Sequence, residues 1–242
     1  MLSKNQIKRI TSLHQKKFRN ETQLFIAEGF KVIEELFNAG FEAEFFFTTT
    51  TALKSIATFV PQLISTTDLS KISCLKTPND CLAVFKMAKS KPINLTGLVI
   101  CLDHIRDPGN LGTIIRLCDW FGVEQLICST ETVDLYNPKV IQATMGSFSR
   151  VNIVYTDLNL FLNETSLPIY GAFMDGENVY ETALSANGIL VLGNEANGIS
   201  ALIASNITAK ISIPRFGTLQ KAESLNVAMA TAILLSEFRR KS

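Results

Sequence analysis

The 242-residue sequence has few of the residues that hold metals or covalent cross-links. It contains two histidines, and its five cysteines include no Cys-x-x-Cys pair. Metal sites of cysteine and histidine use closely spaced ligands, so we expect no metal site. The odd and scattered set of cysteines also argues against a disulfide framework. It favours reduced thiols in a cytoplasmic protein.

Long hydrophobic runs are also missing. Residues 1–10 are charged and are not followed by a continuous apolar segment, so we expect no signal peptide. No apolar run reaches the roughly 18–20 residues that cross a bilayer, so we expect no membrane span. A hydrophobic content of 47% still supports a real core, in one large domain or two small ones.

A strong excess of one charge is missing as well, because the formal net charge is +1. The first twenty residues nevertheless contain no acidic residue, and their basic residues are Lys4, Lys8, Arg9, Lys16, Lys17 and Arg19. A local basic patch can bind nucleic-acid phosphates even in a near-neutral protein. A solvated helix with a basic face explains the same residues, so charge alone leaves both interpretations open.

Helical and strand-like patterns alternate through the first half of the chain, which predicts a small α/β domain over residues 1–92. The polar, proline-containing residues 88–96 are the best linker. The predicted helices cover residues 4–17, 30–37 and 52–59, and the predicted strands cover residues 24–27, 43–49 and 81–87, with a short strand near Leu63.

The same alternation continues through the second half, predicted as a domain of residues 97–242. Its strands are almost continuously apolar, which is typical of a parallel sheet covered by helices on both faces. The strands are predicted at residues 98–102, 125–128, 151–155, 169–173, 189–192 and 207–213, and the helices after Pro108 and over residues 224–239.

The first polar segment, DHIRDPGNLGTIIR over residues 103–116, follows a predicted strand. Ligands of open α/β sheets bind at the carboxyl ends of strands, and a helix N-terminus there suits an anionic group. A plain strand-to-helix turn explains Pro-Gly-Asn as well. The dinucleotide fingerprint Gly-x-Gly-x-x-Gly is absent.

Two further polar segments follow predicted strands. Gly193 and Gly198 have the spacing of a P-loop, but Ile199 stands where that motif requires lysine, which disfavours a nucleotide triphosphatase. Glycines around Asn-Glu-Ala-Asn instead suit a tight loop close to a ligand. The third segment runs from Ile213-Pro214 to Ser224-Leu225-Asn226. We predict Ser224 as the N-cap of the last helix and Asn226 inside its first turn, without a capping role.

Together these segments resemble the SpoU/TrmH branch of the SPOUT methyltransferases over residues 97–240. The resemblance rests on N-L-G-x-x-x-R at residues 110–116, G-N-E-x-x-G at 193–198, and I-P through S-L-N-V at 213–227. Residues 136–147 are similar to a linking segment of that family, although Gln142 stands where the family often has arginine. The N-terminal half resembles the L30e-like domain that binds substrate in many such enzymes, on Lys17-Phe18-Arg19, Phe25 and Glu28-Gly29 with Lys31 and Glu34.

The resemblance implies methyl transfer from S-adenosylmethionine to a ribose 2′-hydroxyl of structured RNA. It also implies a deep trefoil knot in the C-terminal domain and a homodimer with sites at the interface. Ribosomal RNA is the expected substrate. The alternatives are a transfer RNA substrate, methylation of a base, and an RNA-binding protein of the same fold without catalysis.

The resemblance also assigns roles to individual residues. The resemblance assigns Arg116 the activation of the 2′-hydroxyl, but a guanidinium rarely gives up a proton, so a phosphate clamp is an easier role for it. The implied catalytic residues are Asn110, Arg116, Glu195, Ser224 and Asn226. The implied cofactor-binding residues are Ala172, Phe173, Leu192, Gly193, Asn194, Glu195, Ile213, Pro214, Ser224, Leu225 and Asn226. The expected RNA-binding residues are Lys8, Arg9, Lys16, Lys17, Arg19 and Arg116.

Overall fold

The computed structural model describes residues 1–50, 59–218 and 224–240. The chain divides into two compact units. Residues 1–89 and 134–149 form the first, and residues 90–133 and 150–242 form the second. The helix predicted over residues 52–59 lies, apart from its last residue, outside the described residues.

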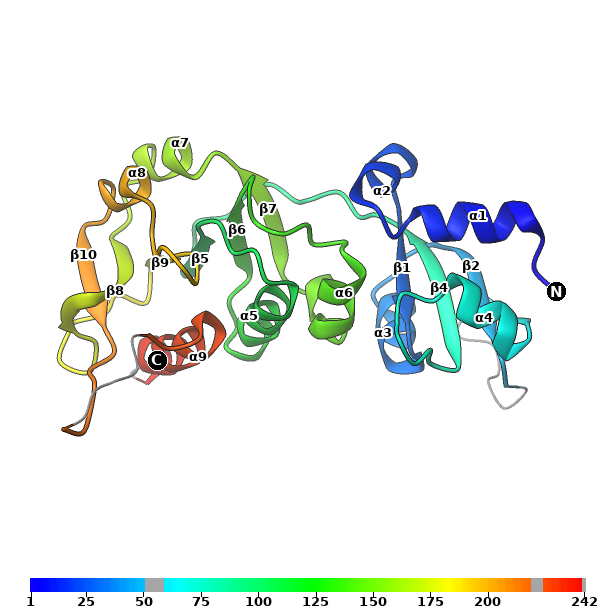
Figure 1. The fold of residues 1–242 in the computed structure, drawn as a ribbon. Coiled ribbons are helices and arrows are strands. Elements are labelled where there is room, and N and C mark those ends of the chain that lie inside the picture. Colours follow the sequence, from blue (N-terminus) through cyan, green and yellow to red (C-terminus); the bar gives the residue numbers. More distant parts are fainter. Residues whose placement is uncertain (51–58, 219–223, 241–242) are drawn as a thin grey trace. The chain divides into compact units, whose positions relative to one another are not determined.

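The first unit is a four-stranded mixed sheet with the strand order β1-β4-β2-β3. Strand β4 is antiparallel to both of its neighbours, and β3 is parallel to β2 (Figure 1). The elements of this unit are α1 (Lys4–Ser12), α2 (Lys16–Thr22), β1 (Leu24–Glu28), α3 (Phe30–Asn38), β2 (Ala43–Thr48), β3 (Gln62–Leu63), α4 (Thr66–Ile72), β4 (Cys81–Lys86), α6 (Pro138–Thr144) and the short 3₁₀ helix η1 (Ser147–Ser149).

All five residues of strand β1 are buried. Because successive side chains of a strand point in opposite directions, β1 is covered on both faces. Leu24 and Ile26 belong to a core that also contains residues of α1 and α4. The ring of Phe25 packs instead against the rings of Tyr136 and Phe148. Residues 134–149, which the sequence assigns to the second domain, therefore contribute to the core of the first unit.

The second unit is a six-stranded sheet in which every neighbouring pair is parallel, with the order β10-β8-β9-β5-β6-β7. This confirms the predicted α/β fold with a parallel sheet. The elements are β5 (Leu98–Leu102), α5 (Pro108–Trp120), β6 (Gln125–Ser129), β7 (Asn152–Thr156), α7 (Leu158–Asn163), β8 (Ile169–Asn178), β9 (Gly188–Leu192), α8 (Ala201–Ala204), β10 (Ala209–Ser212) and α9 (Val227–Arg239).

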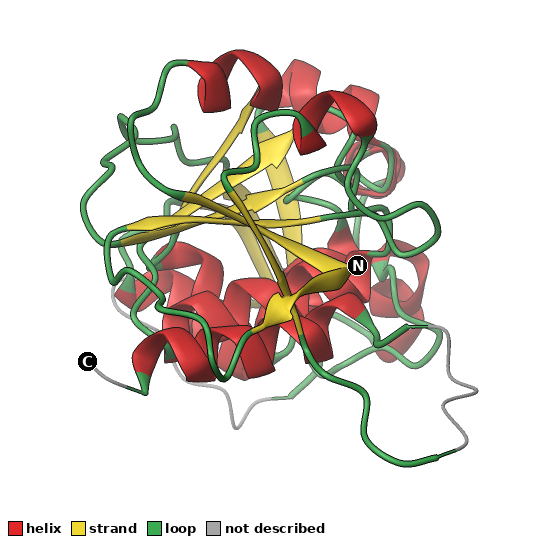
Figure 2. Ribbon diagram, turned by 90° about the vertical axis from the view of Figure 1, so that its left-hand side faces the viewer, coloured by secondary structure: helices red, strands yellow, loops and turns green. Residues whose placement is uncertain are grey.

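Helices cover both faces of this parallel sheet (Figures 1 and 2). Side chains of α7 and α8 pack on one face, in a cluster with residues of β5, β8 and β9. Helices α5 and α9 lie side by side on the other. Strands β5, β6 and β9 are buried at every position, as their apolar sequences predict.

Two kinds of element differ from the prediction. Helices α4, α6, α7 and α8 are missed because none exceeds seven residues, too few for a helical period to show. The last helix begins at Val227, and Asn226 is its N-cap. The Asn226 Oδ1 atom accepts hydrogen bonds from the backbone of Ala228 (2.9 Å) and Met229 (3.4 Å). The N-cap prediction for Ser224 is therefore wrong. Asparagine caps helices as well as serine does, so residue type alone could not decide between the two positions.

Candidate functional site

The three polar segments meet beyond the carboxyl ends of β5, β9 and β10. Asn110 Nδ2 donates a hydrogen bond of 2.8 Å to Glu195 Oε1. Asn226 Nδ2 in turn donates one of 2.9 Å to Asn110 Oδ1. These partners lie 85 and 116 positions apart in the chain, so the hydrogen bonds depend on the tertiary fold. We call these three residues the amide–carboxylate chain.

The helix ends hold the two asparagines in place. Asp107 caps α5 by accepting the backbone N–H of Asn110 at 2.8 Å, and Pro108 occupies the first helical position, which its fixed φ suits. Asn226 divides its amide group between two partners, with the oxygen capping α9 and the nitrogen bonded to Asn110. Each asparagine is thus fixed by its own helix and reaches across to another segment.

The turn over residues 193–198 closes on itself. Asn194 and Gly198 exchange backbone hydrogen bonds of 3.0 and 2.8 Å. A Cβ atom on Gly193 would lie 2.1 Å from the carbonyl carbon of Gly198, so no other residue fits at position 193. The Asn194 Oδ1 atom also accepts the backbone N–H of Ala196. The turn places the Glu195 side chain in solvent at its tip, where it meets Asn110.

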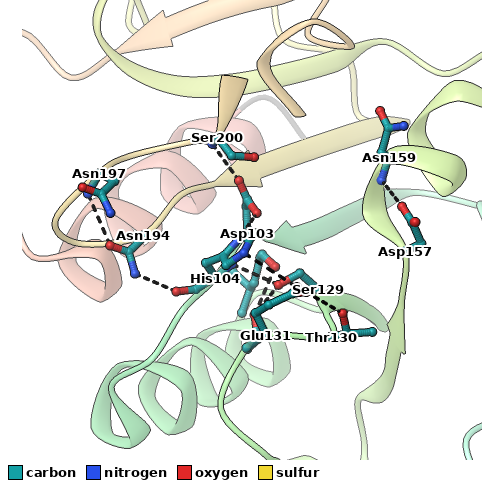
Figure 3. Close-up of polar contacts among 12 residues, drawn as sticks. Asp103, His104, Ser129, Thr130, Glu131, Asp157, Asn159, Asn194, Asn197 and Ser200 are labelled. Atoms are coloured by element: carbon teal, nitrogen blue, oxygen red, sulfur yellow. Dashed lines mark hydrogen bonds and ion pairs between the residues drawn. The ribbon is translucent and has the colours of Figure 1, made fainter. Parts of the chain in front are cut away.

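Asp103 and His104, which the sequence does not single out, lie directly after β5 (Figure 3). Asp103 is 1% exposed, and its Oδ2 atom accepts the backbone N–H of Ser200 at 2.7 Å. Its Oδ1 atom lies 2.5 Å from His104 Nδ1. The backbone carbonyl of His104 accepts a 2.7 Å hydrogen bond from Asn194 Nδ2. A carboxylate directly after a buried strand is the only sequence signal for this pair.

Arg116 lies on the exposed surface of α5, beyond the Asn110 end of the helix. Within residues 1–50, 59–218 and 224–240 its side chain has no hydrogen-bond or ion-pair partner. An unpaired guanidinium presents its full fork of donors, which matches the oxygen atoms of a phosphate. The geometry leaves Arg116 available to a ligand outside the protein.

The predicted cofactor-binding residues are placed as follows. Leu192 is the buried last residue of β9, and Ile213 and Pro214 are half-buried directly after β10. Ser224 and Leu225 are exposed before α9. Ala172 and Phe173 are half-buried in β8, where the Phe173 ring packs with the α7–α8 cluster and lies 4.7 Å from Lys210 Nζ. In the described part of the structure, none of these seven predicted cofactor-binding residues forms a hydrogen bond with the amide–carboxylate chain.

Basic side chains of the first unit differ in their exposure. Lys8, Lys16 and Lys17 are exposed, and Arg9 is exposed and ion-paired with Glu44 at 2.6 Å. Arg19 is 2% exposed.

The buried position of Arg19 corrects its predicted RNA-binding role. Its guanidinium donates to Asp134 Oδ2 at 2.6 and 3.2 Å. It also donates to the backbone carbonyls of Leu13 and His14. Four of its five N–H donors are therefore used inside the first unit.

Other reactive groups do not form a site. All five cysteines are unpaired, and burial raises the pKa of Cys74 to about 12 and that of Cys81 to about 11, which keeps both thiols protonated and unreactive. Across the described residues, no cluster of three or more His, Cys, Asp or Glu side chains is arranged to hold a metal ion. The helices described also include none with the length and apolarity of a membrane span.

Comparison with known proteins supports the resemblance. The SpoU rRNA Methylase family matches residues 97–236, and the MRM3-like substrate binding domain matches residues 4–83. The 23S rRNA (guanosine(2553)-2′-O)-methyltransferase RlmP of Bacillus subtilis is 31% identical over 98% of this chain and 97% of its own length. The 23S rRNA (guanosine-2′-O-)-methyltransferase RlmB of Neisseria meningitidis is 34% identical over 60% of this chain and 58% of its own length.

Solved structures agree along the whole chain. A putative RNA methyltransferase of the TrmH family from Porphyromonas gingivalis has a TM-score of 0.89, 38% identity and full coverage of both chains. An AdoMet-bound rRNA methyltransferase from Sinorhizobium meliloti has a TM-score of 0.86 and 29% identity, covering 99% of this chain and 96% of that one. The chain therefore belongs to the SpoU rRNA methylase family.

Proposed function

We propose that this protein transfers a methyl group from S-adenosylmethionine to a ribose 2′-hydroxyl of ribosomal RNA. The observation that carries the proposal is the amide–carboxylate chain, which joins the three segments at one edge of the sheet beside an α5 that carries the unpaired Arg116. Two full-length relatives support it: one is named a 23S rRNA 2′-O-methyltransferase, and the other is an AdoMet-bound rRNA methyltransferase.

The residues present suit the cofactor. A Cβ at Gly193 would clash with the backbone of Gly198, so the 193–198 turn closes tightly on itself. The open space at Gly198 lets a ligand approach the backbone of the turn closely. Leu225 adds an exposed apolar side chain, and Ile213 follows the end of β10. Mixed apolar surface and backbone polar groups are typical of small-molecule sites. Leu192, Gly193, Ile213, Pro214 and Leu225 would hold the cofactor, which supplies a methyl group activated on a sulfonium.

The remaining chemistry falls to the side chains of this chain. The bound cofactor would supply the methyl group to the ribose 2′-oxygen and leave as a neutral thioether, and the hydroxyl proton would pass to solvent. Arg116 binds the phosphate beside the target ribose with two parallel hydrogen bonds and stabilises the charge that develops on the oxygen. Asn110 and Ser224 place the ribose and phosphate, while Glu195 and Asn226 order the loops. Alignment of two reactants can lower a barrier by about 7–11 kcal/mol.

The first unit favours ribosomal RNA over transfer RNA. The 23S rRNA methyltransferase RlmP of Bacillus subtilis matches 98% of this chain and the rRNA methyltransferase from S. meliloti 99%, so both matches include the first unit. In the first unit Lys8, Lys16 and Lys17 present exposed ammonium groups that can bind phosphates along a structured RNA. We assign RNA substrate binding to a domain of residues 1–92 with an L30e-like fold and catalysis to residues 97–242.

A homodimer is part of the proposal. Trp120 at the end of α5 is 84% exposed, and Met229 on α9 is 59% exposed. Large apolar side chains exposed on two adjoining helices are typical of protein interfaces, and tryptophan is enriched in them. Trp120 lies one helical turn from Arg116 on the same face, so a partner there would border the RNA side of the site.

The proposal also covers the chain path and the location of the protein. The family resemblance implies a trefoil knot in which the last helix passes through a loop, and the Asn226 hydrogen bond holds the start of α9 beside Asn110. Five unpaired cysteines and relatives named for ribosomal RNA support a cytoplasmic location.

Calorimetry and labelled transfer test the proposal together. We expect S-adenosylmethionine to bind the purified protein and its methyl group to appear in unmodified 23S rRNA but not in transfer RNA. Cofactor binding with methylation of transfer RNA alone would change the substrate. The absence of cofactor binding would favour a non-catalytic RNA-binding protein.

A further inference from the structure

Asp103 and His104 hold both ends of the segment that contains Glu195. His104 binds Asn194 at the start of the segment through its backbone carbonyl, and Asp103 binds Ser200 at its end through its carboxylate. Figure 3 shows both contacts converging on the end of β5. We propose that this pair, the Asp103–His104 clamp, is a positioning device for methyl transfer. The inference rests on the proposed function.

The backbone of His104 is unusual for a residue with a side chain. Its φ of +59° lies in the left-handed region, which costs an ordinary residue about 1–2 kcal/mol. Such conformations persist only where the surroundings enforce them, and they cluster at functional sites. Here the backbone N–H of His104 is fixed by Ser129 Oγ at 3.0 Å, and the resulting turn aims the carbonyl at Asn194.

The imidazole of His104 contacts Asp103 and makes no hydrogen bond to the 193–198 turn in the described structure. Its Nδ1 atom contacts Asp103, and its Nε2 atom lies 3.7 Å from Glu131 Oε2 after β6. The group that reaches the 193–198 turn is the carbonyl of His104. The clamp therefore acts through the backbone conformation at position 104, which glycine and asparagine can also adopt.

Asn194 transmits the position of the clamp to the turn. Its amide nitrogen binds His104, and its amide oxygen accepts the backbone N–H groups of Ala196 and Asn197, the two residues that follow Glu195. The next residue is Glu195, whose carboxylate meets Asn110. Release of Asn194 from His104 would free the turn and change where Glu195 meets Asn110.

Four substitutions separate the backbone of His104 from its imidazole. His104→Gly and His104→Asn keep access to the left-handed region, whereas His104→Val does not, because a β-branched residue is strained there. Asn194→Asp keeps the oxygen that accepts from Ala196 and removes the donor to His104 at nearly constant volume. Thermal unfolding of the full chain checks that each variant folds.

The test is calorimetry with S-adenosylmethionine, followed by labelled methyl transfer to 23S rRNA at saturating cofactor. We expect His104→Val and Asn194→Asp to weaken cofactor binding about tenfold, the size of one lost hydrogen bond. We expect His104→Gly and His104→Asn to bind and turn over like the wild type. Faster hydrogen exchange at residues 196–197, in the two weakened variants only, would show the freed turn.

Two results would overturn the clamp. Wild-type affinity in both His104→Val and Asn194→Asp would show that the turn is held without it. Loss of transfer by His104→Gly and His104→Asn, with cofactor affinity intact, would show that the imidazole itself contacts RNA. If His104→Val does not fold, Asn194→Asp and the two permissive variants still decide the question. Failure of the wild type to bind S-adenosylmethionine would instead refute the proposed function.

Discussion

Arg19 and Arg116 are both arginines that the sequence assigns to RNA, and the structure gives them opposite surroundings. Arg19 is 2% exposed, and its guanidinium binds one carboxylate and two carbonyls within the first unit. Arg116 is exposed and has no partner among residues 1–50, 59–218 and 224–240. The comparison shows that a basic residue near a proposed RNA surface becomes a candidate ligand only when its donors are unused.

The two arginines also differ in what their loss would damage. Removing one partner of a buried ion pair leaves an uncompensated charge, which costs folding free energy. Removing an exposed, unpaired guanidinium changes the free energy of unfolding little. It removes the stabilisation that this group gives to the transition state of the reaction.

Arg116→Ala should lower turnover about 100- to 1,000-fold, the size expected for loss of one preorganised donor to a developing negative charge. Cofactor affinity and the free energy of unfolding should stay at wild-type values. Arg116→Lys should recover only part of the rate, because lysine lacks the bidentate fork. Single-turnover methyl transfer and calorimetry measure the two effects separately. Loss of cofactor binding would place Arg116 on the cofactor side of the site.

Arg19→Met should lower the free energy of unfolding by about 3–5 kcal/mol, because the half-buried Asp134 and the carbonyls of Leu13 and His14 lose their buried donor. The double variant Arg19→Met/Asp134→Leu should recover much of that loss. Denaturant unfolding measures both, and Lys16→Met serves as the matched control for an exposed basic residue, with a change within about 0.5 kcal/mol. Equal effects of the Arg19 and Lys16 variants would contradict the buried role.

Asn226→Asp should lower turnover about 5- to 10-fold while keeping the cap of α9. Aspartate caps α9 as well as asparagine does but cannot donate to Asn110 Oδ1, so about 1–1.5 kcal/mol of hydrogen bonding is lost. Asn226→Ala should add a stability loss of about 1 kcal/mol, because the cap is lost as well. Unchanged turnover in Asn226→Asp would show that the amide–carboxylate chain is dispensable.

Glu28→Gln should change the pH dependence of stability in the first unit. Burial raises the pKa of Glu28 above its usual 4.5, although hydrogen bonds from Ser73 and Cys74 oppose the shift. The folded state therefore binds the proton more tightly than the unfolded state, so this contribution is full below pH 4.5 and is lost as the pH rises through the folded pKa. Urea unfolding at several pH values should show wild type losing stability relative to Glu28→Gln over that interval. Parallel curves of unfolding free energy against pH for wild type and Glu28→Gln would contradict the raised pKa of Glu28.

Strand positions and the grouping of motifs follow well from the sequence, because they depend on local apolar runs and on turn residues at strand ends. The parallel sheet and the three polar segments beyond its carboxyl edge are such features. The hydrogen bonds of Asn110 to Glu195 and Asn226 required the tertiary structure, since their partners lie 85 and 116 positions away.

Two parts of the site could not be predicted from local pattern. The burial of Arg19 depends on Asp134, which lies 115 positions away in a segment that packs against β1. The left-handed conformation of His104 depends on Ser129 and Asn194, neither of which is near it in the chain. Asn226 as N-cap shows the opposite case, a local choice between two good capping residues that sequence alone did not decide.

The most direct test is the chemical identity of the product. Unmodified 23S rRNA would be incubated with the wild-type protein and S-adenosylmethionine carrying a labelled methyl group, then digested with nuclease. We predict label in a nuclease-resistant dinucleotide that releases a 2′-O-methylnucleoside, formed about 100- to 1,000-fold more slowly by Arg116→Ala. Label in a methylated base, or a wild-type protein that binds the cofactor and transfers nothing to ribosomal RNA, would contradict it.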